Sequence, residues 1–401
     1  MMRELAIPEG SRSASRRVAK RRRLRAAATV GAWFLGSRAW FWLVAWAALH
    51  WLPHAYVVAP PGYLIPWALP SWLRAWANWD GYWYLSIARD GYAGRPMATA
   101  FFPLYPLLLR AVGGSVAAAV AVSQGAFLAA LGLLWTLAAP WGEATAQWAV
   151  AAAAFFPTAF YFSAVYPESL FLALSLGAVV AASRGRWPWA GVLGGLAAAT
   201  SVYGVLLVPA LFWYGWSRGP RWRWPLLWLG LIPLGLLAYM AYLGAEFGHL
   251  LLFLSVQAIW GRHLAPIWVG LSEGWRAFVA TLGSISWDGL FGPGWPSVTP
   301  SNLWNFALTA WAVVGLGLGL FRIPGPWLLY GALVLIVPLS DPAAGLPLMS
   351  LPRLVLAAFP IFLGFGGAMA KVPEFRRLYF WFSLPTGALL AALFATGHWV
   401  A

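Results

Sequence analysis

A carboxylate lies within an aromatic motif in the first quarter of the chain, Asn78-Trp79-Asp80-Gly81-Tyr82-Trp83-Tyr84. Asn78 is suited to cap a helix, which puts Asp80 in the first turn and Tyr84 on the same face. The positive helix terminus favours the charged carboxylate, whereas the loss of water among aromatic rings disfavours it. Such a group is suited to accept a proton from a hydroxyl group, so Asp80 is a candidate general base. The alternative is that Asp80 only caps the helix.

A second acid, Glu168, follows Tyr166-Pro167 at the start of another predicted helix. Proline followed by an acid is typical of a helix N-terminus, so capping is the simpler interpretation. An acid at the edge of an apolar bundle is costly, however, unless it has a partner or a substrate. We therefore predict Glu168 as a second catalytic residue.

Two arginines are candidates for binding phosphate. Arg353 follows Pro352, and Arg262 follows Trp260-Gly261. The donors of a guanidinium group match phosphate oxygens two at a time. A salt bridge from Arg353 to Asp341 or to another acid is the alternative. Arg38, inside the first apolar run, is expected to reach the headgroups or to pair, with no catalytic role.

Several kinds of site have no counterpart in the sequence. The chain contains no cysteine, no P-loop, no dinucleotide fingerprint, no nucleophile elbow and no zinc-binding His-Glu-x-x-His motif. His249 and His263 are isolated, and isolated histidines are usually structural. We therefore expect neither a metal nor a cofactor.

The composition requires a bilayer. Of the 401 residues, 62% are hydrophobic and 9% are charged, whereas soluble domains carry about 25% charged residues. The net charge of +15 is concentrated just before the first apolar run, where cytoplasmic flanks carry basic residues that face anionic lipids. No nucleic-acid partner is expected, because no soluble aromatic-basic module accompanies this run. The basic residues are Arg12, Arg16, Arg17, Lys20, Arg21, Arg22, Arg23 and Arg25.

Charge and hydropathy together predict the topology of an all-α, multi-pass protein of the cell membrane. Residues 1–27 form a basic cytoplasmic segment, and residues 28–401 form a single integral membrane domain. Short basic loops are assigned to the cytoplasm and most acids to the opposite side. Eleven apolar runs supply the crossings: 28–50, 116–138, 144–164, 168–183, 188–200, 203–216, 224–243, 303–320, 326–340, 354–370 and 379–396.

Two long segments, 51–115 and 244–302, are predicted to lie on the non-cytoplasmic side. Both are rich in Trp, Pro and Gly and poor in charge, which favours a position along the membrane interface. The half-length runs 188–200 and 203–216 are expected to turn near Ser201. Most aromatic residues here should pack these segments onto the helices, but some are expected to line a substrate site. The candidates are Trp79, Trp83, Tyr84, Tyr105, Tyr166, Gln257 and Trp260.

The order and spacing of five motifs resemble the bacterial PIG-V-like mannosyltransferases, relatives of glycosylphosphatidylinositol mannosyltransferase II in the GT-C class. The similarity covers nearly the whole chain after the basic N-terminal segment. One position differs: family members carry an Arg-Pro pair where this chain has Ser201-Val202. The motifs are Asn78 to Tyr92, Phe101 to Arg110, Pro157 to Ser169, Trp260-Gly261-Arg262 and Pro352 to Pro360.

The resemblance implies a fold, a reaction and residue roles. The fold is a GT-C-type bundle of about 11 transmembrane helices with a large first non-cytoplasmic loop carrying interfacial helices. The reaction is inverting transfer of a sugar, usually mannose, from a polyprenyl-phosphate carrier to a hydroxyl group of a glycan, lipid or protein outside the cytoplasm. Asp80 matches the catalytic acid of the first outer loop. Arg353, with Arg262 as second choice, would stabilise the donor phosphate, and Glu168 would orient the acceptor or assist Asp80.

Two other classes remain open. A transporter or flippase for a lipid-linked or polar solute would carry acids and broken helices near the bilayer midplane, related by a repeat. A non-catalytic scaffold of a transferase complex is compatible with the missing arginine at Ser201. The transferase is favoured because the acids collect at one predicted face.

Overall fold

The computed structural model describes residues 9–55, 69–283, 286–287, 290 and 298–400. Parts of the predicted basic segment and of both predicted outer segments, including 1–8, 56–68 and 291–297, lie outside the described residues. Within these ranges the chain is helical and contains no β-strand, only two isolated bridges. The predicted all-α class is therefore confirmed.

The longer helices form where the sequence is apolar and free of breakers. α5 (Val116–Ala138) is dominated by alanine, leucine and valine, and Ser115 caps it by accepting a hydrogen bond from the Ala118 amide at 3.2 Å. Its regular part ends just before Pro140. The other main helices are α1 (Glu9–Trp51), α3 (Asp80–Asp90), α4 (Leu104–Ala111), α6 (Glu143–Ala154), α7 (Glu168–Ser183), α8 (Trp187–Thr200), α9 (Leu207–Trp216), α10 (Leu231–Phe247), α12 (Ile267–Leu282), α14 (Val298–Leu318), α15 (Gly325–Leu339), α17 (Phe359–Lys371) and α18 (Pro373–Ala395).

Several helices are long and apolar enough to cross a membrane. Three of those described satisfy both criteria: Val116–Trp141, Trp224–Phe247 and Pro373–Ala395. A fourth is reached if Leu351–Ala357 and Phe359–Lys371, which meet at 79°, are taken as one broken span. These helices are consistent with a membrane protein, although length and composition alone do not give the predicted eleven spans.

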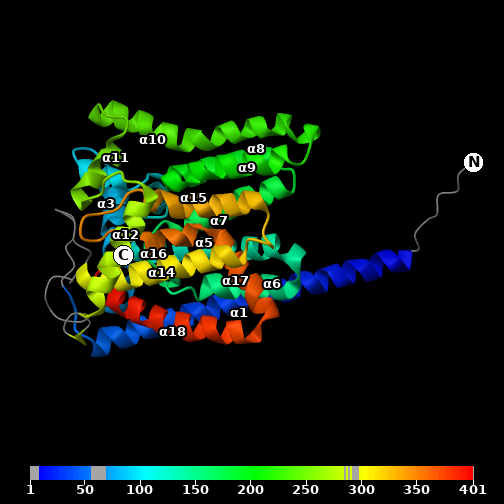
Figure 1. The fold of residues 1–401 in the computed structure, drawn as a ribbon. Helices are drawn as coiled ribbons and strands as arrows, with labels where there is room; N and C mark the ends of the chain where they lie inside the picture. Colours follow the sequence, from blue (N-terminus) through cyan, green and yellow to red (C-terminus); the bar gives the residue numbers. More distant parts are fainter. Residues whose placement is uncertain (1–8, 56–68, 284–285, 288–289, 291–297, 401) are drawn as a thin grey trace, which may run out of the picture.

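The helices run side by side and define two ends of a bundle (Figure 1). The N-terminal part of α1 projects from one end, where the loops joining α9 to α10, α14 to α15 and α17 to α18 also lie. At the opposite end lie α3, α12 and the short helices α11 (Leu252–Ser255) and α16 (Leu351–Leu354). The basic residues that the sequence assigns to the cytoplasm thus occur at the end remote from α3.

Glycines allow α8 and α10 to pack closely. A Cβ atom added at Gly235 of α10 would lie 1.9 Å from the carbonyl oxygen of Gly195 in α8. A Cβ atom at Gly191 would lie 2.2 Å from the carbonyl oxygen of Trp228. Such backbone contact needs small residues and maximises van der Waals packing, as is common between membrane helices.

An irregular segment, 155–167, joins α6 to α7 in the interior. Pro157 follows the end of α6, because proline cannot continue the helical hydrogen bonding. Arg38 of α1 is buried and donates to the carbonyl oxygens of Ala159 at 3.1 Å and Ala154 at 3.3 Å and to Ser163 Oγ at 2.9 Å. Arg38 therefore neither reaches the headgroups nor pairs with an acid, which corrects the prediction; it satisfies backbone groups that the broken helix leaves free.

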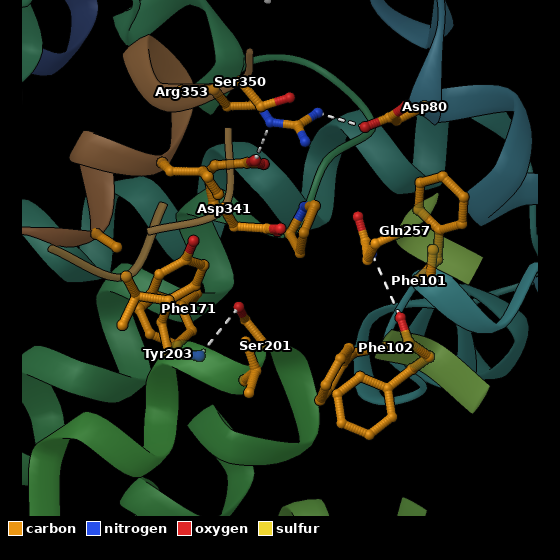
Figure 2. Close-up of a pocket in the computed structure, with 18 of the residues that line it drawn as sticks. Asp80, Phe101, Phe102, Phe171, Ser201, Tyr203, Gln257, Asp341, Ser350 and Arg353 are labelled. Carbon is orange, nitrogen blue, oxygen red and sulfur yellow. Dashed lines mark hydrogen bonds and ion pairs between the residues drawn. The ribbon is translucent and has the colours of Figure 1, made fainter. Parts of the chain in front are cut away.

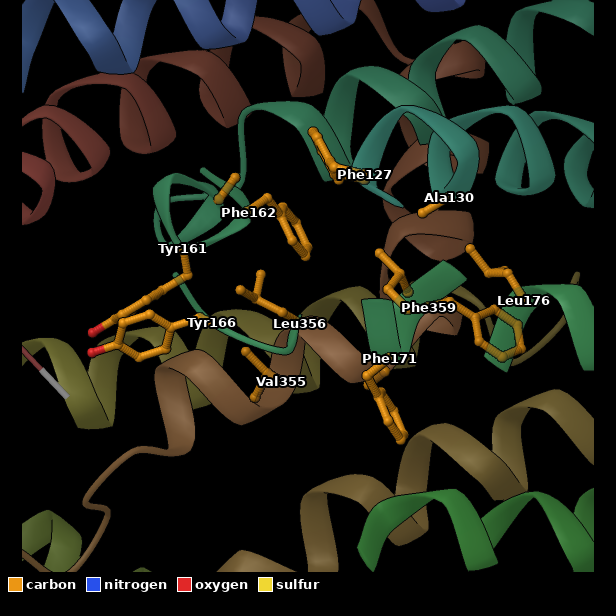
Figure 3. Close-up of a cluster of buried hydrophobic side chains, with 14 of the residues drawn as sticks. Phe127, Ala130, Tyr161, Phe162, Tyr166, Phe171, Leu176, Val355, Leu356 and Phe359 are labelled. Atoms are coloured by element: carbon orange, nitrogen blue, oxygen red, sulfur yellow. The ribbon is translucent and has the colours of Figure 1, made fainter. Parts of the chain in front are cut away.

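Aromatic packing holds the same segment against the core. Phe162 stacks on Phe127 of α5 with ring centroids 4.2 Å apart. Figure 3 shows Tyr161 and Tyr166 side by side, with Val355 nearby in the helical turn Val355–Ala357 that follows α16. This cluster fixes the position of the polypeptide that leads into Glu168.

Candidate functional site

The start of α3 is held by hydrogen bonds from distant segments. Tyr166 Oη accepts a hydrogen bond from the Asp80 amide at 3.0 Å and donates to the Asn78 carbonyl oxygen at 3.1 Å. The sequence predicted that Asn78 caps the helix, but its side chain instead donates to the carbonyl oxygen of Phe394 at 2.8 Å. Trp79 has a φ of 60°, a strained value for a residue with a Cβ atom. The tertiary contacts, rather than a local cap, thus orient Asp80.

Arg353 joins the two predicted acids. Its guanidinium group forms an ion pair with Asp80 Oδ2, and its Nε atom lies 3.1 Å from Glu168 Oε1. The three side chains are 14%, 19% and 11% exposed for Arg353, Asp80 and Glu168. Figure 2 shows Arg353 and Asp80 facing each other across the upper part of the cavity. Three residues from α3, α7 and α16 therefore meet at one point.

Two aromatic rings complete the surroundings of Arg353. The guanidinium carbon lies 5.2 Å from the ring centroid of Tyr166 and 5.9 Å from that of Tyr161. These distances allow cation–π attraction, which is stronger in a desolvated site. Thr158 Oγ1 donates to the Pro352 carbonyl oxygen at 2.7 Å and so ties the irregular segment to the residue before Arg353.

These charged groups line a cavity of about 260 Å³. Phe101, Phe102, Phe171 and Phe253 give it an apolar wall. In Figure 2, Ser201 and Tyr203 lie at the opposite end from Arg353. Ser201 lies in the turn between α8 and the 3-10 helix before α9, as expected from the sequence. The cavity is thus polar at both ends and aromatic along its sides.

Arg262 forms a second polar group in the cavity. It donates to the carbonyl oxygens of Asp341 at 3.2 Å and Met349 at 2.9 Å, and lies 3.5 Å from the Asp341 carboxylate. Asp341 therefore pairs with Arg262, and Arg353 pairs with the other two acids. Because its donors are engaged by backbone oxygens, Arg262 is the less available of the two arginines for phosphate.

The predicted lining residues fall into two groups. Tyr84, Gln257 and Trp260 line the cavity. The other four predicted residues, Trp79, Trp83, Tyr105 and Tyr166, are not part of its wall.

Each of those four side chains has a structural contact instead. Tyr105 is fully buried with its hydroxyl group 2.9 Å from Ser123 Oγ, and Trp83 stacks on Phe101 with centroids 5.4 Å apart. Tyr166 supports the site from behind through the hydrogen bonds described above. Trp79 Nε1 donates to the His398 carbonyl oxygen. Packing between elements, which the sequence does not show, engages these side chains outside the cavity wall.

Two residues near the charged groups were not anticipated. Tyr161 contacts Arg353, and Trp399 lines the cavity together with Asp80. Tyr161 lies five residues before Tyr166, within the motif Pro157 to Ser169. No pattern in the residues around Trp399 indicates a site. Trp399 is more than 300 residues from Asp80 in the chain.

The protonation of one lining residue follows from its surroundings. Burial, followed by the negative charges of Glu168 and Asp80, raises the pKa of Tyr84 well above its ordinary value. Tyr84 is therefore a neutral hydrogen-bonding group near neutral pH. Among the residues that the structure describes, no three His, Asp or Glu side chains are placed to hold a metal ion.

The site offers three chemical capabilities. Asp80 can accept a proton, because it is a carboxylate in the cavity wall and Arg353 contacts it at Oδ2. Arg353 can stabilise negative charge, and the aromatic wall can contact an apolar or ring-shaped group. Comparisons of the chain with protein-family models, with curated proteins and with solved structures give no match.

Proposed function

We propose that this protein is an inverting membrane glycosyltransferase that moves a sugar, in the first instance mannose, from a polyprenyl-phosphate carrier to an acceptor hydroxyl group. The observation that carries the proposal is that Asp80, Glu168 and Arg353 line one cavity with an aromatic wall. Their arrangement matches the roles that the motif resemblance implies. A lipid-linked donor also suits a site with charged groups beside apolar side chains.

In the proposed reaction Asp80 takes the proton of the acceptor hydroxyl group. The acceptor oxygen forms a bond to the anomeric carbon, and the bond between that carbon and the carrier phosphate oxygen breaks. The polyprenyl phosphate leaves with the bonding electrons, on the face opposite the attack, so that the configuration inverts. Arg353 stabilises the charge that develops on the leaving phosphate. Glu168 assists Asp80 through the guanidinium group that the two acids share.

Arg353 can perform this role only if its present ion pairs loosen. It lies between two carboxylates, and one of them, Asp80, loses its charge when it accepts the proton. The attraction of Arg353 for the departing phosphate then increases at the moment when phosphate charge develops. Proton transfer and leaving-group stabilisation are therefore coupled through one guanidinium group.

We further propose that eleven helices cross the membrane, with the cavity on the non-cytoplasmic side. Support comes from the exposed basic residues Lys20 to Arg25 on the part of α1 that projects from the end remote from α3. Several of these helices are shorter than a bilayer requires on its own, which is tolerated where neighbouring protein surrounds them. The proposed spans are α1, α5, α6, α7, α8, α9, α10, α14, α15, α17 and α18.

A reconstitution experiment tests the proposal. The purified protein in lipid vesicles is supplied with radiolabelled polyprenyl-phosphate mannose and an extract of membrane acceptors. We expect label to move into a product whose new linkage has the opposite anomeric configuration from the donor. Movement of intact glycolipid between leaflets, without transfer, would support a flippase. The absence of both transfer and flipping, with donor bound, would support a scaffold.

A further inference from the structure

A tryptophan that the reaction scheme does not use faces the catalytic groups. Trp399 lines the cavity together with Asp80 and Glu168. It is only partly buried, whereas its neighbours His398 and Val400 are 4% and 1% exposed. The backbone around it is therefore inside the protein while its side chain meets the cavity.

The segment that carries Trp399 is fixed on both sides. Trp79 Nε1 donates to the His398 carbonyl oxygen at 3.0 Å, and Trp304 Nε1 donates to the Val400 carbonyl oxygen at 2.6 Å. The rings of Trp79 and Trp399 are perpendicular, with centroids 4.9 Å apart. Because Trp79 directly precedes Asp80, these contacts set the position of the Trp399 indole relative to the proposed base.

Three shielded polar atoms of the cavity residues have no hydrogen-bond partner in the described part of the chain: the donors Trp399 Nε1 and Arg353 Nε, and the acceptor Glu168 Oε2. Arg353 Nε lies 3.1 Å from Glu168 Oε1 in an ion pair, whereas the structure gives no ion pair for the other two atoms. Shielded polar atoms are nearly always hydrogen-bonded, so Trp399 Nε1 and Glu168 Oε2 point to a ligand that both accepts and donates. A hydroxyl group both donates and accepts, whereas a phosphate oxygen can satisfy only the donor.

We propose that the part of the cavity bounded by Trp399, Glu168 and Asp80 binds the ring of the transferred sugar. This inference rests on the proposed function and names its sugar subsite. The indole packs on the ring C–H groups and donates to a sugar oxygen, while Glu168 accepts from a hydroxyl group. An indole beside the anomeric carbon also favours the positive charge that develops there.

A binding experiment with two lipids tests the subsite. Affinities of the purified protein for polyprenyl-phosphate mannose and for bare polyprenyl phosphate are measured in detergent for wild type, Trp399→Leu and Trp399→Phe. We expect Trp399→Leu to bind the mannosyl lipid about tenfold more weakly and Trp399→Phe, which keeps a ring but loses the donor, about threefold more weakly. Binding of bare polyprenyl phosphate should not change and reports that the variants are folded. Trp381→Leu, at a 79% exposed position on α18, is the matched control and should bind both lipids as wild type does.

Other results would overturn the inference in distinguishable ways. Equal weakening for both lipids would assign Trp399 to the fold or to the lipid and phosphate site. Unchanged affinity for the mannosyl lipid in both variants would place the sugar elsewhere while leaving the proposed transferase intact. Failure of the wild-type protein to bind either lipid would remove the proposed function and, with it, the subsite.

Discussion

Replacing Asp80 by asparagine separates the proton-accepting role of this side chain from its structural one. The substitution keeps the size of the side chain and an oxygen that can accept a hydrogen bond from Arg353. The hydrogen bond from the Asp80 amide to Tyr166 involves only the backbone of this residue and is retained. The charge that accepts the proton is lost.

The structure sets the size of the expected effects. A general base contributes about 10²- to 10⁴-fold in rate, so turnover of Asp80→Asn should fall by that factor. Arg353 keeps Glu168 at 3.1 Å, so the loss of stability should stay below the roughly 3–5 kcal/mol expected when a buried charge is left with no partner. Activity should thus fall far more than stability.

The assay is transfer of radiolabelled mannose from polyprenyl-phosphate mannose to acceptors in membranes, with expression matched between proteins. Asp90→Asn is the matched control, because Asp90 lies at the other end of α3, is 41% exposed and pairs with Arg89. We expect its turnover to stay within about twofold of wild type, since exposed ion pairs contribute little. Thermal unfolding in detergent measures the stability of each variant.

The reasoning would be refuted if Asp80→Asn kept turnover within a few-fold of wild type. Asp80 would then serve only to hold Arg353. Equal losses in the Asp80 and Asp90 variants would also contradict it, because a general effect on α3 would then explain both.

Three further predictions concern Arg353, Arg38 and a helix contact. Arg353→Ala leaves two buried carboxylates without a cation, so the free energy of unfolding should fall by about 3–5 kcal/mol and donor affinity should weaken. Adding Glu168→Gln should restore part of the stability but not the donor affinity. Restored donor affinity in the double variant would move the phosphate site elsewhere. Arg38→Leu leaves buried carbonyl groups unsatisfied and should lower the thermal unfolding midpoint by several degrees, at about 1–3 kcal/mol for each lost partner. Arg38→Lys should restore little of this stability, because one ammonium group cannot replace the guanidinium fork. Full restoration by Arg38→Lys would contradict the role of Arg38 in binding these carbonyl groups. Gly235→Ala should lower the free energy of unfolding by about 1–3 kcal/mol, because the added methyl group meets a carbonyl oxygen of α8. Gly230→Ala is the control, because nothing lies within 4 Å of a Cβ atom added there. It should leave the free energy of unfolding unchanged in the same measurement.

Much of the fold could be predicted because it depends on local sequence. Long apolar runs predicted the helices, and the turn near Ser201 was placed correctly between α8 and α9. Proline and its neighbours also indicated where helices begin, as at Glu168. The number of membrane crossings remains a prediction, since several of the helices are too short to be identified as spans by length and composition.

The candidate site was predicted only in part. Residue type alone selected Asp80, Glu168 and Arg353, because ionised groups are rare and costly in an apolar chain. It could not decide which acid pairs with which arginine. The alternative pairing of Arg353 with Asp341 is wrong, because Asp341 lies beside Arg262. The prediction that Asn78 caps α3 is also wrong, because its side chain donates to the carbonyl oxygen of Phe394 near the end of α18.

The sequence by itself determined that this protein is helical, apolar and basic at one end, since propensity, hydropathy and charge act over neighbouring residues. Only the tertiary structure decided that residues 273 positions apart form an ion pair, that four of the seven predicted lining residues lie outside the cavity wall, and that Trp399 is part of it. The physical reason is that contacts between distant residues depend on how helices pack against each other. That packing is set by the shapes of all the facing side chains together, and no short motif contains this information.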